Sequence, residues 1–235
     1  GFPPEYIPSL IFADILMIFF VWLIMHKTAY SVFKGKKRVF YSLSVLVFLI
    51  VWFYIAFILA KSGFFVKLYF SFLPNVALLF LPIIIVATIL RNSSDFRIFV
   101  DGIKQQWLIS MQILRFMGII FLFLYAMKLM PWEFAIPSGV GDIIVGTSAP
   151  IVAYIYSLKK SYSKKLAIIW NFIGICELAL AIVLGFFTSP TPYQTLAENN
   201  PNSLLFDYPL ALIPTFAVPL SIILHIFALR VLLKK

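Results

Sequence analysis

Four ionisable residues stand well inside long apolar stretches of this chain: Asp14, Arg115, Asp142 and Glu177. An ionisable side chain in hydrocarbon is costly and is usually kept for a functional reason. A buried arginine can bind an anion or balance a carboxylate, and a buried carboxylate can carry a proton. These four residues are therefore the first candidates for a binding site.

Arg115 and Glu177 are predicted to lie at the same depth. Each stands about ten residues inside its apolar stretch, which is roughly 15 Å at the α-helical rise. That depth is close to the middle of a hydrocarbon core about 30 Å thick. We expect an ion pair between them, with Arg115 as the anion-binding or charge-balancing group and Glu177 as the proton carrier, because either charge alone would be expensive. The alternative is that the pair only fixes the register of two helices.

Asp14 and Asp142 are predicted to lie nearer the outer face and to line a vestibule. If their helices start at residues 7 and 139, they lie roughly 10 Å and 6 Å below that face. One arginine would then face up to three carboxylates, and at least one acid in a shared cavity would hold a proton near neutral pH. This arrangement favours proton coupling. The alternative is that each aspartate lies close enough to a helix start to be solvated.

The helix that carries Glu177 also carries a stripe of mostly small residues. The stripe follows helical spacing at Asn171, Gly174, Leu178, Ala181 and Gly185. Small residues allow helices to approach closely, which explains most of this pattern without a ligand. Asn171 is expected either to hydrogen-bond across helices or to line the inner part of a path. Trp170 is expected to be a cavity wall or an interface anchor.

Prolines inside two apolar stretches are candidate hinges. Pro82 stands in the third stretch, and Pro214 and Pro219 stand in the seventh. An internal proline frees a backbone carbonyl and favours a kink, and kinked helices serve as hinges or carbonyl ligands in transporters. Proline is also frequent in membrane helices that transport nothing.

No cofactor is expected. His26 and His225 are weak candidates for haem or metal ligation, since their depths differ and no third ligand accompanies them. Cys176 is the single cysteine, so no cysteine cluster can hold a metal. Ser138 has no histidine at its depth to activate it, so an enzyme is not the expected class.

Composition indicates the elements that position these residues. The 235 residues are 63% hydrophobic and 12% charged, whereas soluble domains are about 45–50% apolar and about 25% charged. We therefore predict an all-α, polytopic membrane protein that forms a single domain over residues 1–235. The seven predicted spans are 7–26, 39–60, 69–90, 105–127, 139–158, 166–187 and 208–229.

Basic residues set the predicted orientation. Most of the 19 lysines and arginines lie in the first, third and fifth loops and in the tail, whereas the opposite side has only Lys61, Lys67 and Lys128. The positive side is cytoplasmic, which places the N-terminus outside and the C-terminus inside an inner or plasma membrane. Despite the net charge of +10, the cations form no solvated stripe, which argues against nucleic acid as a partner.

The first and fifth spans begin alike, with Ile-Pro-Ser followed by Asp-Ile at Asp14 and Asp142. This similarity raises the hypothesis of a parallel 3+1+3 duplication, with repeats 7–90 and 137–229 and a linker helix 105–127. Chance similarity among apolar helices is the alternative.

The predicted topology resembles that of seven-helix proteins such as SWEET-type sugar transporters and microbial rhodopsins. The last span has no lysine, so retinal cannot be attached where rhodopsins attach it. The segment from Arg115 to Asp142 and the Trp170-Asn171 helix are also similar to uncharacterised bacterial multi-pass proteins.

The expected function is that of a membrane transporter or permease-like protein that binds a small polar solute or ion at a midplane site, with proton coupling. Two alternatives stay open. The chain could be a sensor or receptor-like binding module, or a membrane subunit of a larger complex or homo-oligomer. The expected partners are the lipid bilayer, the solute and, for the second alternative, another protein.

Overall fold

The computed structural model describes residues 1–67 and 72–234, and no strand occurs among them. The elements are η1 (Pro4–Tyr6), α1 (Ile7–Val32), α2 (Gly35–Lys61), α3 (Phe64–Lys67), α4 (Phe72–Asn92), α5 (Ser94–Asp101), α6 (Gln105–Ser110), η2 (Met111–Gly118), α7 (Ile119–Ala126), α8 (Trp132–Ser157), α9 (Ser163–Thr188), η3 (Leu204–Phe206), η4 (Ile213–Ala217) and α10 (Val218–Leu233).

The predicted all-α multi-pass architecture is confirmed. Among the described residues, six helical stretches are long and apolar enough to cross a membrane, and α4 with α5 makes a seventh if that pair, bent by 105°, is one broken span. Spanning backbone must satisfy its own hydrogen bonds in lipid, which helices do. The start of the third predicted span, residue 69, lies outside the described residues.

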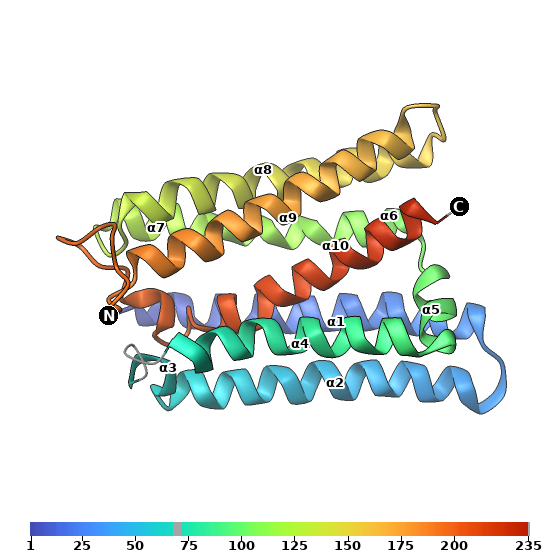
Figure 1. Ribbon diagram of the computed structural model, residues 1–235, viewed down its shortest axis with the longest axis horizontal. Coiled ribbons are helices and arrows are strands. Elements are labelled where there is room, and N and C mark those ends of the chain that lie inside the picture. The colour runs from blue at the N-terminus through green and yellow to red at the C-terminus, as the bar shows by residue number, and fades with distance from the viewer. Residues whose placement is uncertain (68–71, 235) are drawn as a thin grey trace.

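The helices form two layers with a pair of segments between them. Helices α1, α2 and α4 lie on one side, α8 and α9 on the other, and the α6–η2–α7 segment and α10 between (Figure 1). The N-terminus and the loop after α9 lie at one end. The C-terminus, α5, the α1–α2 turn and the α8–α9 turn lie at the other (Figure 1). The cation-rich connections thus gather at one end of the bundle. The orientation of the bundle, the identity of the membrane and the duplication stay predictions.

Helix α1 shows how the sequence directs one aspartate inward. Its buried side chains recur at helical spacing and include Leu10, Asp14 and Met17. Phe12 and Ile15 lie on the opposite face, exposed to 59% and 50%. Because the apolar face is left for lipid, Asp14 is directed into the bundle.

One predicted helix start and one predicted helix end differ from the structure. Helix α8 begins at Trp132 rather than at 139, and it passes through Pro137 without ending. A proline inside a helix removes one backbone donor and favours a kink, yet α8 continues through Pro137 and Pro150 to Ser157. Helix α1 likewise continues beyond 26 to Val32.

The fourth span is not a uniform α-helix. Its centre, η2, is a 3-10 helix between α6 and α7. A 3-10 helix has three residues per turn, so Gln112, Arg115 and Gly118 share one face, and all three are buried. The Gln112 side chain donates to the Ser221 carbonyl of α10 at 3.2 Å.

The seventh span begins with a π-helical turn. The Val218 N–H bonds to the Ile213 carbonyl, and Pro219 has no N–H to offer. The Thr215 carbonyl therefore lacks its usual α-helical donor. Trp52 Nε1 of α2 donates to that oxygen at 3.0 Å, which replaces the bond that the proline removes.

Replacing Trp52 by phenylalanine is expected to destabilise the protein by about 1–3 kcal/mol, the cost of an orphaned buried acceptor. In a Pro219→Ala background, residue 219 regains an N–H, so the same substitution should cost less. Detergent-solubilised unfolding of the four variants measures this difference, and the packing change at residue 52 cancels in the cycle. An equal cost in both backgrounds would show that the Thr215 carbonyl does not depend on Trp52.

Asp101 joins α5 to the end of α10. Its carboxylate pairs with Arg230 at 2.8 Å and with Lys234 at 2.9 Å. Partial burial disfavours ionisation of this carboxyl, but the hydrogen bonds and charges of the two cations outweigh that effect and hold the pKa of Asp101 below its ordinary value. This contact fixes the short α5 helix against the C-terminal end of the bundle.

Candidate functional site

A buried cluster of charges joins η2, α8 and α9. Arg115 Nε donates to Asp142 Oδ1 at 2.7 Å, and Arg115 Nη1 donates to the Gly174 carbonyl at 3.1 Å. Arg115 Nη2 pairs with Glu177. The expected ion pair between Arg115 and Glu177 is therefore present, and Asp142 is a second partner.

The guanidinium is occupied by these partners. Each of its three nitrogens contacts an oxygen of α8 or α9, and the side chain is 3% exposed. An incoming anion would have to share Arg115 with two carboxylates, which repel it. The geometry thus makes Arg115 a charge-balancing residue rather than an open anion site.

Asp142 lies deeper than predicted. Because α8 begins at Trp132, Asp142 is about ten residues inside the helix, roughly 15 Å from its start. Solvation at a helix start, the alternative interpretation of this residue, is wrong. The early start of α8 brings Asp142 to the depth of Arg115.

Glycines make room for this cluster. An added Cβ at Gly118 would meet the Asp142 side chain. At Gly141 it would lie 2.6 Å from Glu177 Oε1, and at Gly146 it would lie 2.5 Å from the Phe116 backbone nitrogen. Real Cβ atoms essentially never approach so closely. These three glycines therefore allow η2, α8 and α9 to pack closely, and this packing brings the carboxylates to Arg115.

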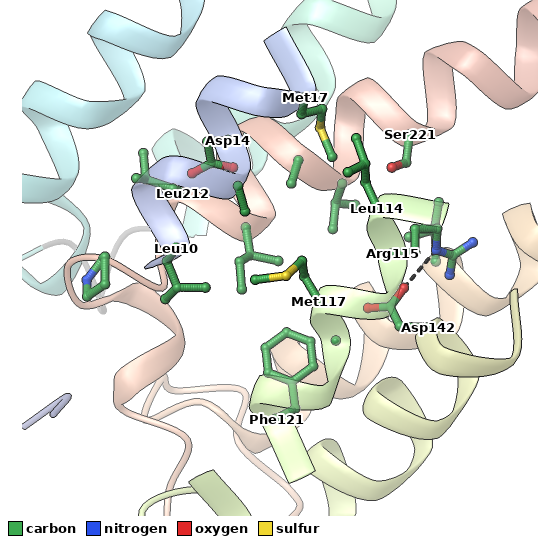
Figure 2. Close-up of a pocket in the computed structure, with 17 residues that line it drawn as sticks. Leu10, Asp14, Met17, Leu114, Arg115, Met117, Phe121, Asp142, Leu212 and Ser221 are labelled. Atoms are coloured by element: carbon green, nitrogen blue, oxygen red, sulfur yellow. Dashed lines mark hydrogen bonds and ion pairs between the residues drawn. The ribbon is translucent and has the colours of Figure 1, made fainter. Parts of the chain in front are cut away.

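Asp14, Arg115 and Asp142 line one cavity of about 60 Å³. Figure 2 places Asp14 of α1 on one wall and the Arg115–Asp142 pair on the opposite wall. The other lining residues are mostly apolar: Leu10, Ala13, Met17, Leu114, Met117, Gly118, Phe121, Leu178, Pro209, Leu212, Ile213, Ala217, Val218 and Ser221. A cavity of this size has room for a few water molecules. Glu177 is not part of the lining and reaches the site through Arg115.

Asp14 differs from the other two carboxylates. It is 8% exposed, yet none of the described residues donates a hydrogen bond to it or pairs with it. Buried charges are normally paired. Asp14 can therefore gain or lose a proton, or accept a ligand, without breaking an ion pair.

A second cavity, of about 90 Å³, adjoins the first. The two share Phe121, Asp142, Leu178, Ile213 and Val218 as lining residues. The second extends towards the loop after α9, since Thr191 and Leu205 also line it, and its walls are mostly apolar. Asp142 thus stands where a polar and an apolar compartment meet.

Asn171 and Trp170 belong to a polar network one helical turn from Gly174. Asn171 Nδ2 donates to the Ala167 carbonyl, so its Oδ1 accepts from His225 Nδ1 at 2.8 Å. The Trp170 ring lies 5.6 Å from the His225 ring, and its Nε1 donates to Ser148 at 2.9 Å. Trp170 is thus buried between α8, α9 and α10, and it is not an interface anchor.

The donor arrangement fixes the protonation of His225. Because Nδ1 carries the proton donated to Asn171, Nε2 of the neutral ring is an acceptor. This buried nitrogen has no partner among the described residues. An added Cβ at Gly174 would lie 2.6 Å from Nε2 and 3.4 Å from Arg115 Nη1. The histidine and arginine side chains therefore both lie against Gly174.

The two histidines have different environments. His26 pairs with Ser42 of α2 at 2.8 Å, whereas His225 pairs with Asn171 of α9. Within the described residues, no group of three or more acidic, histidine or cysteine side chains could hold a metal ion.

The candidate hinges lie at different places. Pro82 is buried inside α4. Pro214 is in the π-helical turn and lines the second cavity, and Pro219 follows it at the start of α10. The two prolines of the seventh span therefore adjoin the candidate site, whereas Pro82 lines neither cavity.

Sequence reasoning missed three contributors: Gln112, Gly118 and the role of His225. The three-residue spacing of Gln112, Arg115 and Gly118 was a usable signal, since it matches the repeat of a 3-10 helix. The partner of His225 is remote in sequence, and no local pattern indicates it.

No curated protein and no solved structure matches this chain. One family model does match, over residues 63–233, which is more than half of the chain. The matched part contains Arg115, Asp142 and Glu177, and it begins after the α1–α2 pair that carries Asp14. The chain belongs to the family described as Domain of unknown function (DUF8737).

Proposed function

We propose that this protein is a membrane transporter or permease-like protein that binds a small polar solute or ion at the cavity between Asp14 and the Arg115–Asp142 pair. The observation that carries the proposal is the buried, unpartnered carboxylate of Asp14 in a cavity. A group of this kind in a membrane helix is costly unless it binds something.

The three carboxylates have different roles in this proposal. Asp142 and Glu177 neutralise Arg115 and hold it in place. Asp14 binds the proton or the solute, since its occupancy changes without breaking an ion pair. Proton coupling then follows from competition at Asp14, because a proton and a cationic solute cannot occupy the same carboxylate together.

Two irregular helical segments around the cavity act as hinges in this proposal. The cavity is bounded by the 3-10 helix η2 and by the π-helical turn before Pro219. Irregular turns inside a helix often mark hinges. The Asn171–His225 pair lies one turn farther towards the end that is predicted to be cytoplasmic, and it extends a polar route beyond Arg115.

Reconstitution tests the proposal. Liposomes that contain the protein and a pH-sensitive dye are given amines, amino acids, sugars or monovalent salts. We expect proton movement with at least one solute class, and we expect Asp14→Asn to abolish it. Asp95→Asn, which changes an exposed aspartate paired with Lys37, is the matched control and should retain activity.

Thermal unfolding of the same variants separates the alternatives. A solute raises the melting temperature of the protein that binds it. Binding that depends on Asp14 without any flux would replace transport by a sensor or receptor-like function. No binding and no flux, with Glu177→Gln destabilised at every pH, would mean that the charges only hold the helices together.

A further inference from the structure

The charges around the cavity are unbalanced. Asp14 and Asp142 face the cavity and Glu177 lies behind it, against a single cation, Arg115. The guanidinium nitrogens already contact Asp142, Glu177 and the Gly174 carbonyl. The site therefore offers carboxylate oxygens, and each nitrogen of Arg115, the one cation that the described residues bring to it, already has an oxygen partner.

The second cavity adds an apolar compartment to this acidic one. The Phe121 and Phe134 rings meet there edge to face, with centroids 5.1 Å apart. Leu178 and Val218 line both cavities beside Asp142. An occupant of the two compartments would place a polar group near the carboxylates and an apolar group against the aromatic rings.

We propose that the ligand of this site is a small protonated amine with an apolar substituent, its ammonium group in the cavity lined by Asp14 and Asp142 and its substituent in the cavity lined by Phe121 and Phe134. This inference rests on the proposed function and names the solute class. Carboxylates bind ammonium groups by charge-assisted hydrogen bonds. Aromatic walls favour organic cations further.

Cavity size limits the amine. The compartments measure about 60 Å³ and about 90 Å³, which together approach the volume of the engineered apolar cavity, about 150 Å³, that admits benzene. An amine with one aromatic ring, such as benzylamine, matches this space. Drug-sized ligands usually occupy pockets of about 300–1,000 Å³.

Other ligand classes fit less well. An anion would face two carboxylates and would have to share Arg115 with its partners. A calcium ion needs about six to eight oxygen ligands, and no cluster of three ligating side chains exists among the described residues. A neutral sugar would leave the apolar compartment unused or would bury hydroxyl groups in it.

Thermal unfolding of the purified protein at neutral pH tests the inference with three probes of similar shape: benzylamine, benzyl alcohol and benzoate. We expect benzylamine to raise the melting temperature and the other two to have little effect. This comparison uses only the wild-type protein. Equal stabilisation by benzyl alcohol or by benzoate would overturn the amine proposal.

Two variants test whether benzylamine binds in the two cavities. Asp14→Asn should weaken the apparent benzylamine affinity about 10-fold or more, because a charged hydrogen-bond partner is lost. Ala181→Leu should weaken it by filling the second cavity, which Ala181 lines. Asp95→Asn is the matched control and should leave it unchanged. Unchanged affinity in both Asp14→Asn and Ala181→Leu would overturn the assignment.

The liposome assay separates this inference from the proposed function. Asp14-dependent flux of another solute, with no binding of benzylamine, would overturn the amine class alone. Absence of Asp14-dependent flux for every solute, with benzylamine still bound at the cavity, would overturn transport and support the ligand class.

Discussion

Replacing Arg115 by methionine is expected to lower the free energy of unfolding by about 3–5 kcal/mol, the usual cost of breaking a buried ion pair from one side. The substitution keeps an unbranched side chain of similar length but leaves Asp142 and Glu177 near each other without their cation. The Gly174 carbonyl also loses its donor. Reversible unfolding in mixed detergent micelles measures the change.

A neutralised variant is the control for this prediction. Arg115→Met combined with Asp142→Asn and Glu177→Gln removes the charges together, and the triple variant should recover much of the lost stability. Arg115→Lys should lie between wild type and Arg115→Met, since an ammonium group is charged but cannot span three acceptors as a guanidinium does. If Arg115→Met is as stable as wild type, the two carboxylates must reach water and the cluster is not sealed.

The triple variant also separates structure from function. A folded, neutralised protein without flux would show that the charges are needed for transport. A folded, neutralised protein with normal flux would reduce the Arg115 cluster to a helix-packing device and leave Asp14 as the functional group.

Sequence reasoning predicted the multi-pass helical fold and the Arg115–Glu177 contact. Both depend on the cost of polar groups in hydrocarbon, which is readable residue by residue. The depth match of Arg115 and Glu177 needs only the rise of a helix and the thickness of the membrane. Predictions that depend on these constraints stay valid when the predicted helix ends are wrong by a few residues.

Asp142 shows where this reasoning failed. The predicted span began at residue 139, yet α8 extends through Pro137 to Trp132. The shift moves Asp142 from a solvated position to a contact with Arg115. The 3-10 and π-helical turns could not be predicted from the local sequence either. Side chains remote in sequence, such as Trp52 and Gln112, donate to backbone carbonyls of α10 and the turn before it.

The proposed Asp14–Asp142 equivalence stays a hypothesis, and their environments differ. Asp142 pairs with Arg115, whereas Asp14 has no partner among the described residues. The Ile-Pro-Ser segment stands at the start of α1, but in α8 the same segment follows the first turn. If the two segments arose by duplication, their aspartates have since acquired different environments and roles.

Gly146→Ala is expected to damage the site, although it alters no charge. The new methyl group would lie 2.5 Å from the Phe116 backbone nitrogen and 3.1 Å from its Cα. Backbone atoms cannot rotate away as a side chain does, so α8 and η2 must separate. Overpacking of this kind costs about 1–3 kcal/mol and sometimes more.

The displacement should reach Arg115, because Phe116 is the next residue and the Arg115 carbonyl carbon would lie 3.2 Å from the same methyl group. Benzylamine stabilisation and flux should therefore fall together with the melting temperature. Gly185→Ala is the matched control for the melting temperature only, because Gly185 lines the second cavity. Its methyl group meets the end of the Leu205 side chain at 2.9 Å, which can move by a rotamer change, so a small loss is expected. Equal losses of melting temperature at the two glycines would show that η2 yields as readily as a leucine side chain, so that its contact with Gly146 does not fix the position of Arg115.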